Sequence, residues 1–220
     1  MAVPFELLDK YQITFIDFWR LRPRGFLIRV RAEPTKYLSA AQFMGVSSTL
    51  MLALIVIAMS VNQQNIEKIT GSKMASPEAL AGRYLVMILV VLLGNTLLYR
   101  IISPRWPVRG KVNFVSLFEF QCYMVAILIP FLVIDVVLDP IGISLVASKV
   151  APSWVLFIPA VIGGVAGFVC YFLYQNPGIA ALNGVSSLRM FLGTAFWVMV
   201  FQITVGVVVA IVVGIVLVTR

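Results

Sequence analysis

Four polar side chains lie inside the long apolar runs of this sequence and are the first candidates for chemistry: Glu119, Gln121, Asp135 and Gln202. A polar or ionisable group at membrane depth is a functional candidate by default, here for the passage of protons or cations. Glu119 and Asp135 are 16 residues apart, roughly 24 Å along a helix, so they cannot act as a carboxylate pair. The alternatives are a solvated helix end for Asp135 and, for Glu119, a headgroup-level ion pair with Arg100, Arg109 or Lys111.

The residue types that are missing exclude much of enzymology. The chain has no histidine, which excludes Ser-His-Asp triads, HExxH zinc sites and His-ligated haem. Cys122 and Cys170 each lie in an apolar run, 48 residues apart, and are interpreted as packing residues. No phosphate-binding loop, EF-hand loop or dinucleotide fingerprint occurs. We therefore expect no enzymatic activity, no cofactor and no metal; an enzyme acting on lipids would need a polar catalytic cluster that we cannot assemble from these residues.

The elements that must position these residues are membrane-spanning helices. Of 220 residues, 61% are hydrophobic and 12% charged, and the mean hydropathy is +1.01. A spanning helix needs roughly 20 apolar residues. The apolar runs predict an all-α bundle of five spanning helices, at residues 41–61, 83–102, 114–138, 154–174 and 190–218.

The first 40 residues differ from the rest and form a separate segment ahead of the membrane domain at 41–220. Aromatic residues recur there at three- and four-residue spacing, which is typical of a helix lying in the membrane interface: Tyr11, Phe15, Phe18 and Trp19. The same rings could instead bind a soluble partner. The cations that follow are predicted to contact lipid phosphates of anionic headgroups: Arg20, Arg22, Arg24, Arg29, Arg31 and Lys36.

The distribution of positive charge predicts the orientation. The net charge is +8, and with five spans twelve of the 17 Lys and Arg residues fall on the side of the N-terminus. Cytoplasmic loops carry the excess of Lys and Arg in membrane proteins, so the N-terminus is expected in the cytoplasm and the C-terminus on the opposite side. The charge is thus explained by the membrane surface, and no nucleic acid is expected as a partner. The short N-terminal segment and compact loops favour a bacterial inner membrane.

Small residues at four-residue spacing mark two helix-packing surfaces. One is the pair Gly163 and Gly167, and the other is the ridge Gly206, Ala210 and Gly214. Such ridges let two helix backbones approach closely. We expect them to pack within the bundle; contact between protomers or with other membrane proteins is the alternative.

Three short motifs resemble the Yip1-like family of five-span membrane proteins. Residues 22–27 (RPRGFL) followed by 33–35 (EPT) are similar to the entry segment of bacterial members. Residues 109–114 (RGKVNF), with a helix reaching Pro130, resemble the passage into the family's third helix, although Val112 and Asn113 replace the usual Gly-Ser. Residues 184–189 (GVSSLR) resemble the connection before the last helix.

This resemblance implies a non-enzymatic membrane component, linked in eukaryotic members to vesicle traffic and organelle shape. The function expected first is therefore a scaffold or an accessory subunit of a membrane complex. The alternative is a small permease or ion channel with Glu119 and Asp135 in its pathway.

Overall fold

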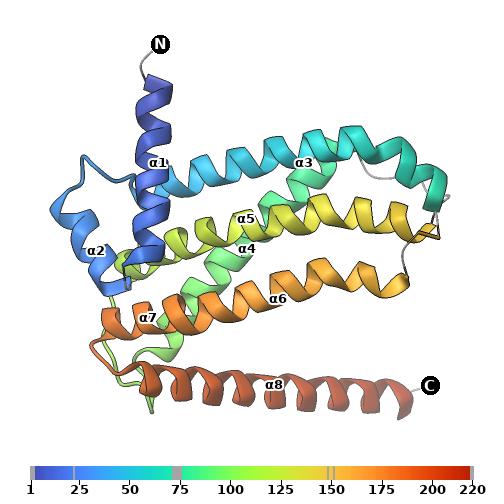
Figure 1. Ribbon diagram of the computed structural model, residues 1–220. Helices are drawn as coiled ribbons and strands as arrows, with labels where there is room; N and C mark the ends of the chain where they lie inside the picture. Colours follow the sequence, from blue (N-terminus) through green and yellow to red (C-terminus); the bar gives the residue numbers. More distant parts are fainter. Residues whose placement is uncertain (1–2, 22, 71–75, 148, 151, 219–220) are drawn as a thin grey trace.

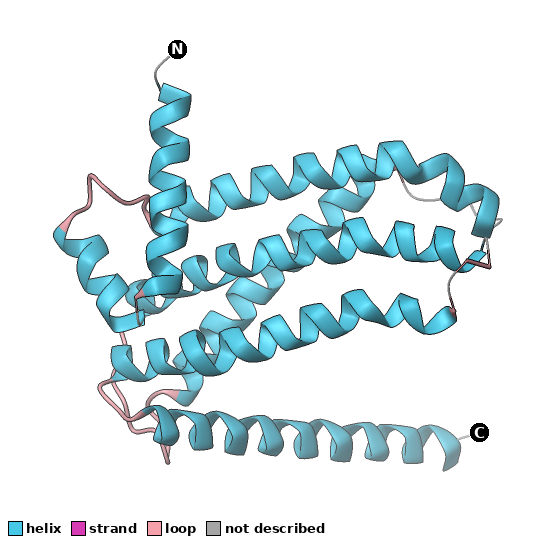
Figure 2. Ribbon diagram, in the orientation of Figure 1, coloured by secondary structure: helices cyan, strands magenta, loops and turns pink. Residues whose placement is uncertain are grey.

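The computed structural model describes residues 3–21, 23–70, 76–147, 149–150 and 152–218, and in these ranges every regular element is a helix (Figures 1 and 2). The all-α fold expected from the sequence is confirmed. Two shorter helices come first, α1 (Val3–Arg20) and α2 (Pro23–Ala32). The remaining elements are α3 (Ala40–Thr70), α4 (Pro77–Ile102), α5 (Phe114–Ala147), η1 (Ser153–Phe157), α6 (Ile158–Cys170), η2 (Tyr171–Gln175), α7 (Asn176–Asn183) and α8 (Ser187–Val218).

Within the part of the chain that the structure describes, five helical stretches are long and apolar enough to cross a membrane, which supports a multi-pass integral membrane protein. They are Ala40–Ala58, Ala81–Ile102, Phe114–Phe131, Val161–Asn183 and Ser187–Thr204. Each overlaps one predicted span. Helices are the expected solution because lipid offers no partner for backbone N–H and C=O groups.

The fourth span differs from the prediction at its end. It was expected to stop at residue 174, but η2 and α7 carry the same helix on to Asn183. Pro177 has no N–H to bond to the preceding turn, and its ring crowds the carbonyl four residues earlier. The wider π-helical turn of η2 ends two residues before Pro177 and lets the helix continue through it. The α7 end is instead set by Gly184, whose φ of 65° forms a left-handed cap.

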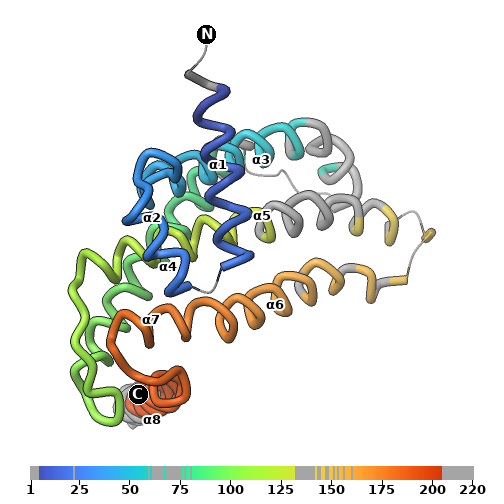
Figure 3. The backbone as a smooth tube through the Cα atoms, turned by 60° about the vertical axis from the view of Figure 1, so that its left-hand side comes forward, coloured from blue at the N-terminus to red at the C-terminus, as the bar shows by residue number. Residues whose placement is uncertain are grey.

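The spans lie side by side around α5, which contacts α3, α4, α6 and α7 (Figure 1). Helix α1 stands nearly perpendicular to them, at the end of the bundle where α3 begins and α7 ends, and α2 lies at the same end (Figures 1 and 3). Helix α8 occupies the edge of the bundle and packs mainly on α7 and α4.

The first turns of α8 are fastened to the connection between α4 and α5. Arg189 Nε donates to the Pro107 carbonyl at 2.6 Å, and Trp197 Nε1 donates to the Trp106 carbonyl at 2.8 Å. Gly193 lies so close to Val108 that an added Cβ would come 2.3 Å from its Cγ2 atom. These contacts fix the rotation of α8 about its own axis, and with it the face that points away from the bundle.

Candidate functional site

A cluster of aromatic rings holds the N-terminal segment against the bundle. Phe18 is 1% exposed and is surrounded by rings from three elements. Its ring centroid lies 5.1 Å from that of Phe26 in α2 and 5.5 Å from that of Tyr174 in η2. Phe26 in turn lies 5.1 Å from Tyr123 of α5. Residues 3–21 and 23–39, which dock in this way, are called the N-terminal cap.

Hydrogen bonds fasten the cap at the same place. Tyr174 Oη donates to the Trp19 carbonyl at 2.9 Å, and Tyr123 Oη donates to the Leu38 carbonyl at 2.8 Å. Within the cap, Tyr37 Oη donates to Asp17 Oδ2 at 2.7 Å. Two bonds therefore join the cap to the spans through backbone carbonyls, so the cap is seated by both ring packing and directional bonds.

The docking places the aromatic residues of α1 against protein, while their predicted role as membrane anchors stays a prediction. Phe18 is buried, Trp19 packs on Tyr174 at 5.0 Å between centroids, and Tyr11 packs on Phe43 at 5.0 Å. Phe15 is partly buried against the same cluster. These rings bury against protein because α3, α5 and η2 supply complementary rings, a choice that helical spacing alone does not encode. The exposed large apolar side chains described in α1 are Phe5, Leu7, Leu8 and Ile16.

The basic residues of the cap lie at its surface. Of the six cations predicted to contact lipid, Arg22 lies outside the described residues. The other five are exposed: Arg20, Arg24, Arg29, Arg31 and Lys36. Lys36 Nζ lies 3.3 Å from Glu33 Oε2, and this contact raises the pKa of Lys36. Burial, followed by the hydrogen bond to Asp17, raises the pKa of Tyr37. Contact of the cations with lipid phosphates stays a prediction.

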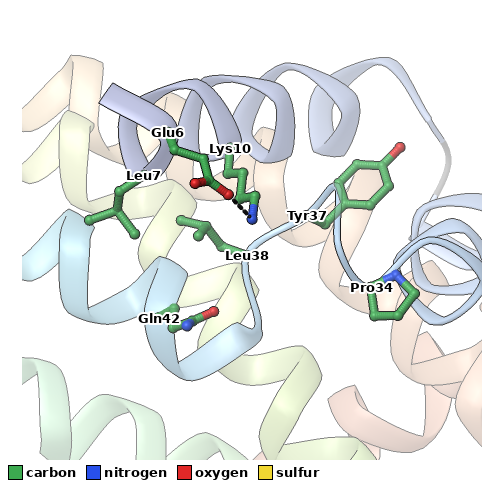
Figure 4. Close-up of a pocket in the computed structure, with 7 residues that line it drawn as sticks. All are labelled: Glu6, Leu7, Lys10, Pro34, Tyr37, Leu38 and Gln42. Carbon is green, nitrogen blue, oxygen red and sulfur yellow. Dashed lines mark ion pairs between the residues drawn. The ribbon is translucent and has the colours of Figure 1, made fainter. Parts of the chain in front are cut away.

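A pocket of about 290 Å³ opens between α1, the α2–α3 connection and α3 (Figure 4). Its lining combines an ion pair with apolar and amide groups, from Glu6, Leu7, Lys10, Pro34, Tyr37, Leu38 and Gln42. Lys10 Nζ lies 2.7 Å from Glu6 Oε1, and their hydrogen bond lowers the pKa of Glu6. The pocket is thus a polar feature at the surface of the cap. The residues that α1 contributes to it lie outside the five spanning stretches.

The three intramembrane polar candidates whose side chains the structure describes are not gathered at one site. Glu119 forms an exposed ion pair with Arg31 of α2, with 3.9 Å between Oε2 and Nη2. Its partner is therefore not one of the three cations expected from the sequence, because α2 folds back beside the start of α5; Arg100 instead donates to the Val112 carbonyl. Gln202 is exposed on α8. The side chain of Asp135 lies outside the described residues.

Gln121 is the one candidate that the structure buries completely. Neither its Nε2 nor its Oε1 atom has a hydrogen-bond partner among the described residues. A buried amide without a partner costs free energy, so this position is either a local weakness or a place where a ligand binds. Nothing in the helical spacing of α5 predicted that Gln121 would be fully buried while Glu119, two residues earlier, is only partly buried.

The glycine pair of the fourth span does not pack as expected. Gly163 and Gly167 line an apolar groove of about 310 Å³ between α4, α5 and α6. A Cβ added at Gly167 would meet no atom within 4 Å outside its own helix and neighbours, so no second helix touches it. The close approach in this region is elsewhere, between Gly178 and the ring of Phe120. The surroundings of Gly206, Ala210 and Gly214 lie outside the described side chains.

Comparison with protein-family models, curated proteins and solved structures finds no match to this chain. The Yip1-like resemblance therefore rests on the three sequence motifs and the order of the spans.

Proposed function

We propose that this chain is a non-enzymatic integral membrane protein, a Yip1-like scaffold or an accessory subunit of a membrane complex. The observation that supports this best is the docked cap. Phe18 and Phe26 are buried, and two tyrosine hydroxyls of the spans bond to cap carbonyls, so the outer surface of the cap keeps a fixed place on the bundle. A surface ordered in advance binds another protein without first losing conformational entropy.

The placement of the polar residues supports the same proposal. Glu119 is paired with Arg31 at the surface, and Gln202 is exposed on α8. A passage for ions needs polar groups that face one another across a shared cavity. Gln121, in contrast to these two residues, is buried, and its amide has no hydrogen-bond partner among the described residues.

The proposed setting is a bacterial inner membrane with the cap on the cytoplasmic side. Helices α1 and α2 lie at the same end of the bundle as the connection between α4 and α5 (Figure 1). Both regions are rich in Lys and Arg, as cytoplasmic segments are. The exposed cap arginines would then contact anionic headgroups, and the remaining cap surface would contact a protein.

The test is photo-crosslinking in native membranes, with the crosslinking amino acid placed at Phe5 of the cap. Phe5 is 72% exposed; Phe157 of η1, 68% exposed and at the other end of the bundle, is the matched control. We expect a reproducible protein adduct from position 5 and not from position 157, and a complex of matching mass after gentle solubilisation. Lipid adducts alone, together with an isolated monomer, would refute the scaffold role.

A small permease is the second candidate, and the unpartnered amide of Gln121 is the observation in its favour. If the chain conducts, purified protein in liposomes will pass an ion or solute, and Q121L, E119Q or D135N will change that flux. Flux that is absent for every solute tested, or unchanged in all three variants, would remove this candidate.

A further inference from the structure

The outward face of α8 forms a regular seam. Its residues recur at alternating spacings of four and three, and all are exposed: Leu188, Leu192, Ala195, Met199 and Gln202. This is the spacing with which two parallel helices pack side by side in a coiled coil. Gly206 takes the next position of the same register in the sequence. The opposite face is already used, because Met190 and Thr194 are buried.

Gln202 is the polar exception on this seam, and it lies at the centre of the helix. Helix α8 has 32 residues, from Ser187 to Val218, and Gln202 is the sixteenth of them. It also lies near the middle of the predicted span 190–218, where acyl chains offer no hydrogen bond. Among the residues that the structure describes, none bonds to its side chain.

The chemistry of the amide identifies the partner. A glutamine side chain carries both a donor and an acceptor, so two glutamines related by a two-fold axis satisfy each other. Two copies of this chain share one orientation in a membrane, which makes their α8 helices parallel and puts both Gln202 side chains at the same depth. Any other partner would need its own polar group at that depth. Ala195 is the seam residue that precedes Met199. Its side chain is small enough to let the two helices approach.

We propose that α8 is the interface of a symmetric dimer in the membrane, with Gln202 of one copy hydrogen-bonded to Gln202 of the other. The seam Leu188, Leu192, Ala195 and Met199 supplies the apolar part of this interface. The dimer goes beyond the proposed function, since it concerns a surface remote from the cap and does not depend on which protein the cap binds.

The first test is disulfide crosslinking, in native membranes, of variants that each carry one added cysteine. M199C and A195C lie on the seam and keep Gln202, and F201C and I203C are matched controls, because Phe201 and Ile203 are 67% and 60% exposed but point to other sides of α8. Cys122 and Cys170 are buried, so the unmodified chain gives the background. A disulfide requires Cα atoms within about 7 Å. We expect dimers from M199C and A195C and few from F201C and I203C.

The second test is energy transfer between labelled copies diluted in lipid bilayers. An interhelical hydrogen bond in a membrane predicts that Q202L weakens dimerisation roughly 3- to 30-fold, while Q202N and F201L stay close to the unmodified chain. Equal crosslinking on and off the seam, unchanged dimerisation of Q202L, or crosslinking of M199C only to a different protein would each overturn the dimer. A lost dimer with a retained adduct at position 5 would leave the scaffold role standing.

Discussion

Truncation of Phe18 tests whether the cap is held by its aromatic cluster. Phe18 is 1% exposed, with the rings of Phe26 and Tyr174 at 5.1 and 5.5 Å. Removing a buried phenylalanine ring costs about 3–5 kcal/mol in transfer and cavity terms. Because 1.4 kcal/mol is a factor of ten, F18A is expected to raise the population of undocked cap by about two to three and a half orders of magnitude.

Amide hydrogen exchange of the protein in lipid nanodiscs measures this opening, since α1 amides exchange only when the helix leaves its site and frays. In F18A the protection of α1 is expected to fall while the protection of α5 is kept. Phe5, in the same helix but 72% exposed, supplies the control F5A, which removes the same ring without a cavity. If F18A and F5A exchange alike, the cluster does not hold the cap and the reasoning fails.

Three further results are expected. A Cβ at Gly178 would come 2.1 Å from Phe120 Cζ, so G178A should lower the free energy of unfolding by about 1–3 kcal/mol. G164A is the control and should not lower it, because a Cβ at Gly164 would meet no atom within 4 Å. Q121M should raise the free energy of unfolding by about 1–3 kcal/mol, because it removes an unpartnered amide. A lower free energy of unfolding in Q121M would instead show that the amide binds a partner. Burial raises the pKa of Tyr37 in the folded protein. The stabilisation of the cap by the neutral Tyr37 hydroxyl is therefore fully present below pH about 10, and it is lost as the pH rises through the pKa of the folded state. Tryptophan fluorescence should report cap release in alkali, with a weaker pH dependence in Y37F.

The number and type of the spans followed from the sequence because lipid leaves so few choices. A long apolar run must be a helix that satisfies its own backbone, and the five runs became five spanning helices. The end of the fourth was less predictable. Pro177 reads as a helix stop in sequence, and whether a π-helical turn absorbs it depends on the packing around Tyr171–Gln175.

The sequence did not predict what the aromatic face of α1 packs against. Spacing identifies which residues share a face, but membrane and protein both accept the same rings. The choice was made by Tyr174, 155 residues away from the Trp19 carbonyl that it binds. The same limit applies to Glu119, whose pairing with Arg31 depends on α2 folding beside α5.

The rotation of each span about its own axis could not be predicted from the sequence either, for a different reason. Helices α5 and α8 are apolar on all sides, so no amphipathic pattern says which face turns inward. Gln121 and Gln202 are the same residue type in similar surroundings in sequence, yet one is fully buried and the other exposed. Their environments were decided by the tertiary contacts of each helix, which for α8 are those that Arg189, Gly193 and Trp197 make with the preceding connection.

These placements separate two surfaces of the molecule. The cap packs on α3, α5 and α7, whereas α8 packs on α7 and α4 and turns its seam away from the bundle. Helix α1 and helix α8 lie on different sides of the spans in both views (Figures 1 and 3). Both surfaces contact α7, but Phe18 and Gln202 have no side-chain partner in common among the described residues, and changes at such distant sites add independently. F18A should therefore leave dimerisation unchanged, and Q202L should leave exchange of α1 unchanged. Coupling between the two would mean that the cap and α8 move together, which a cap fixed by the Phe18 cluster does not allow.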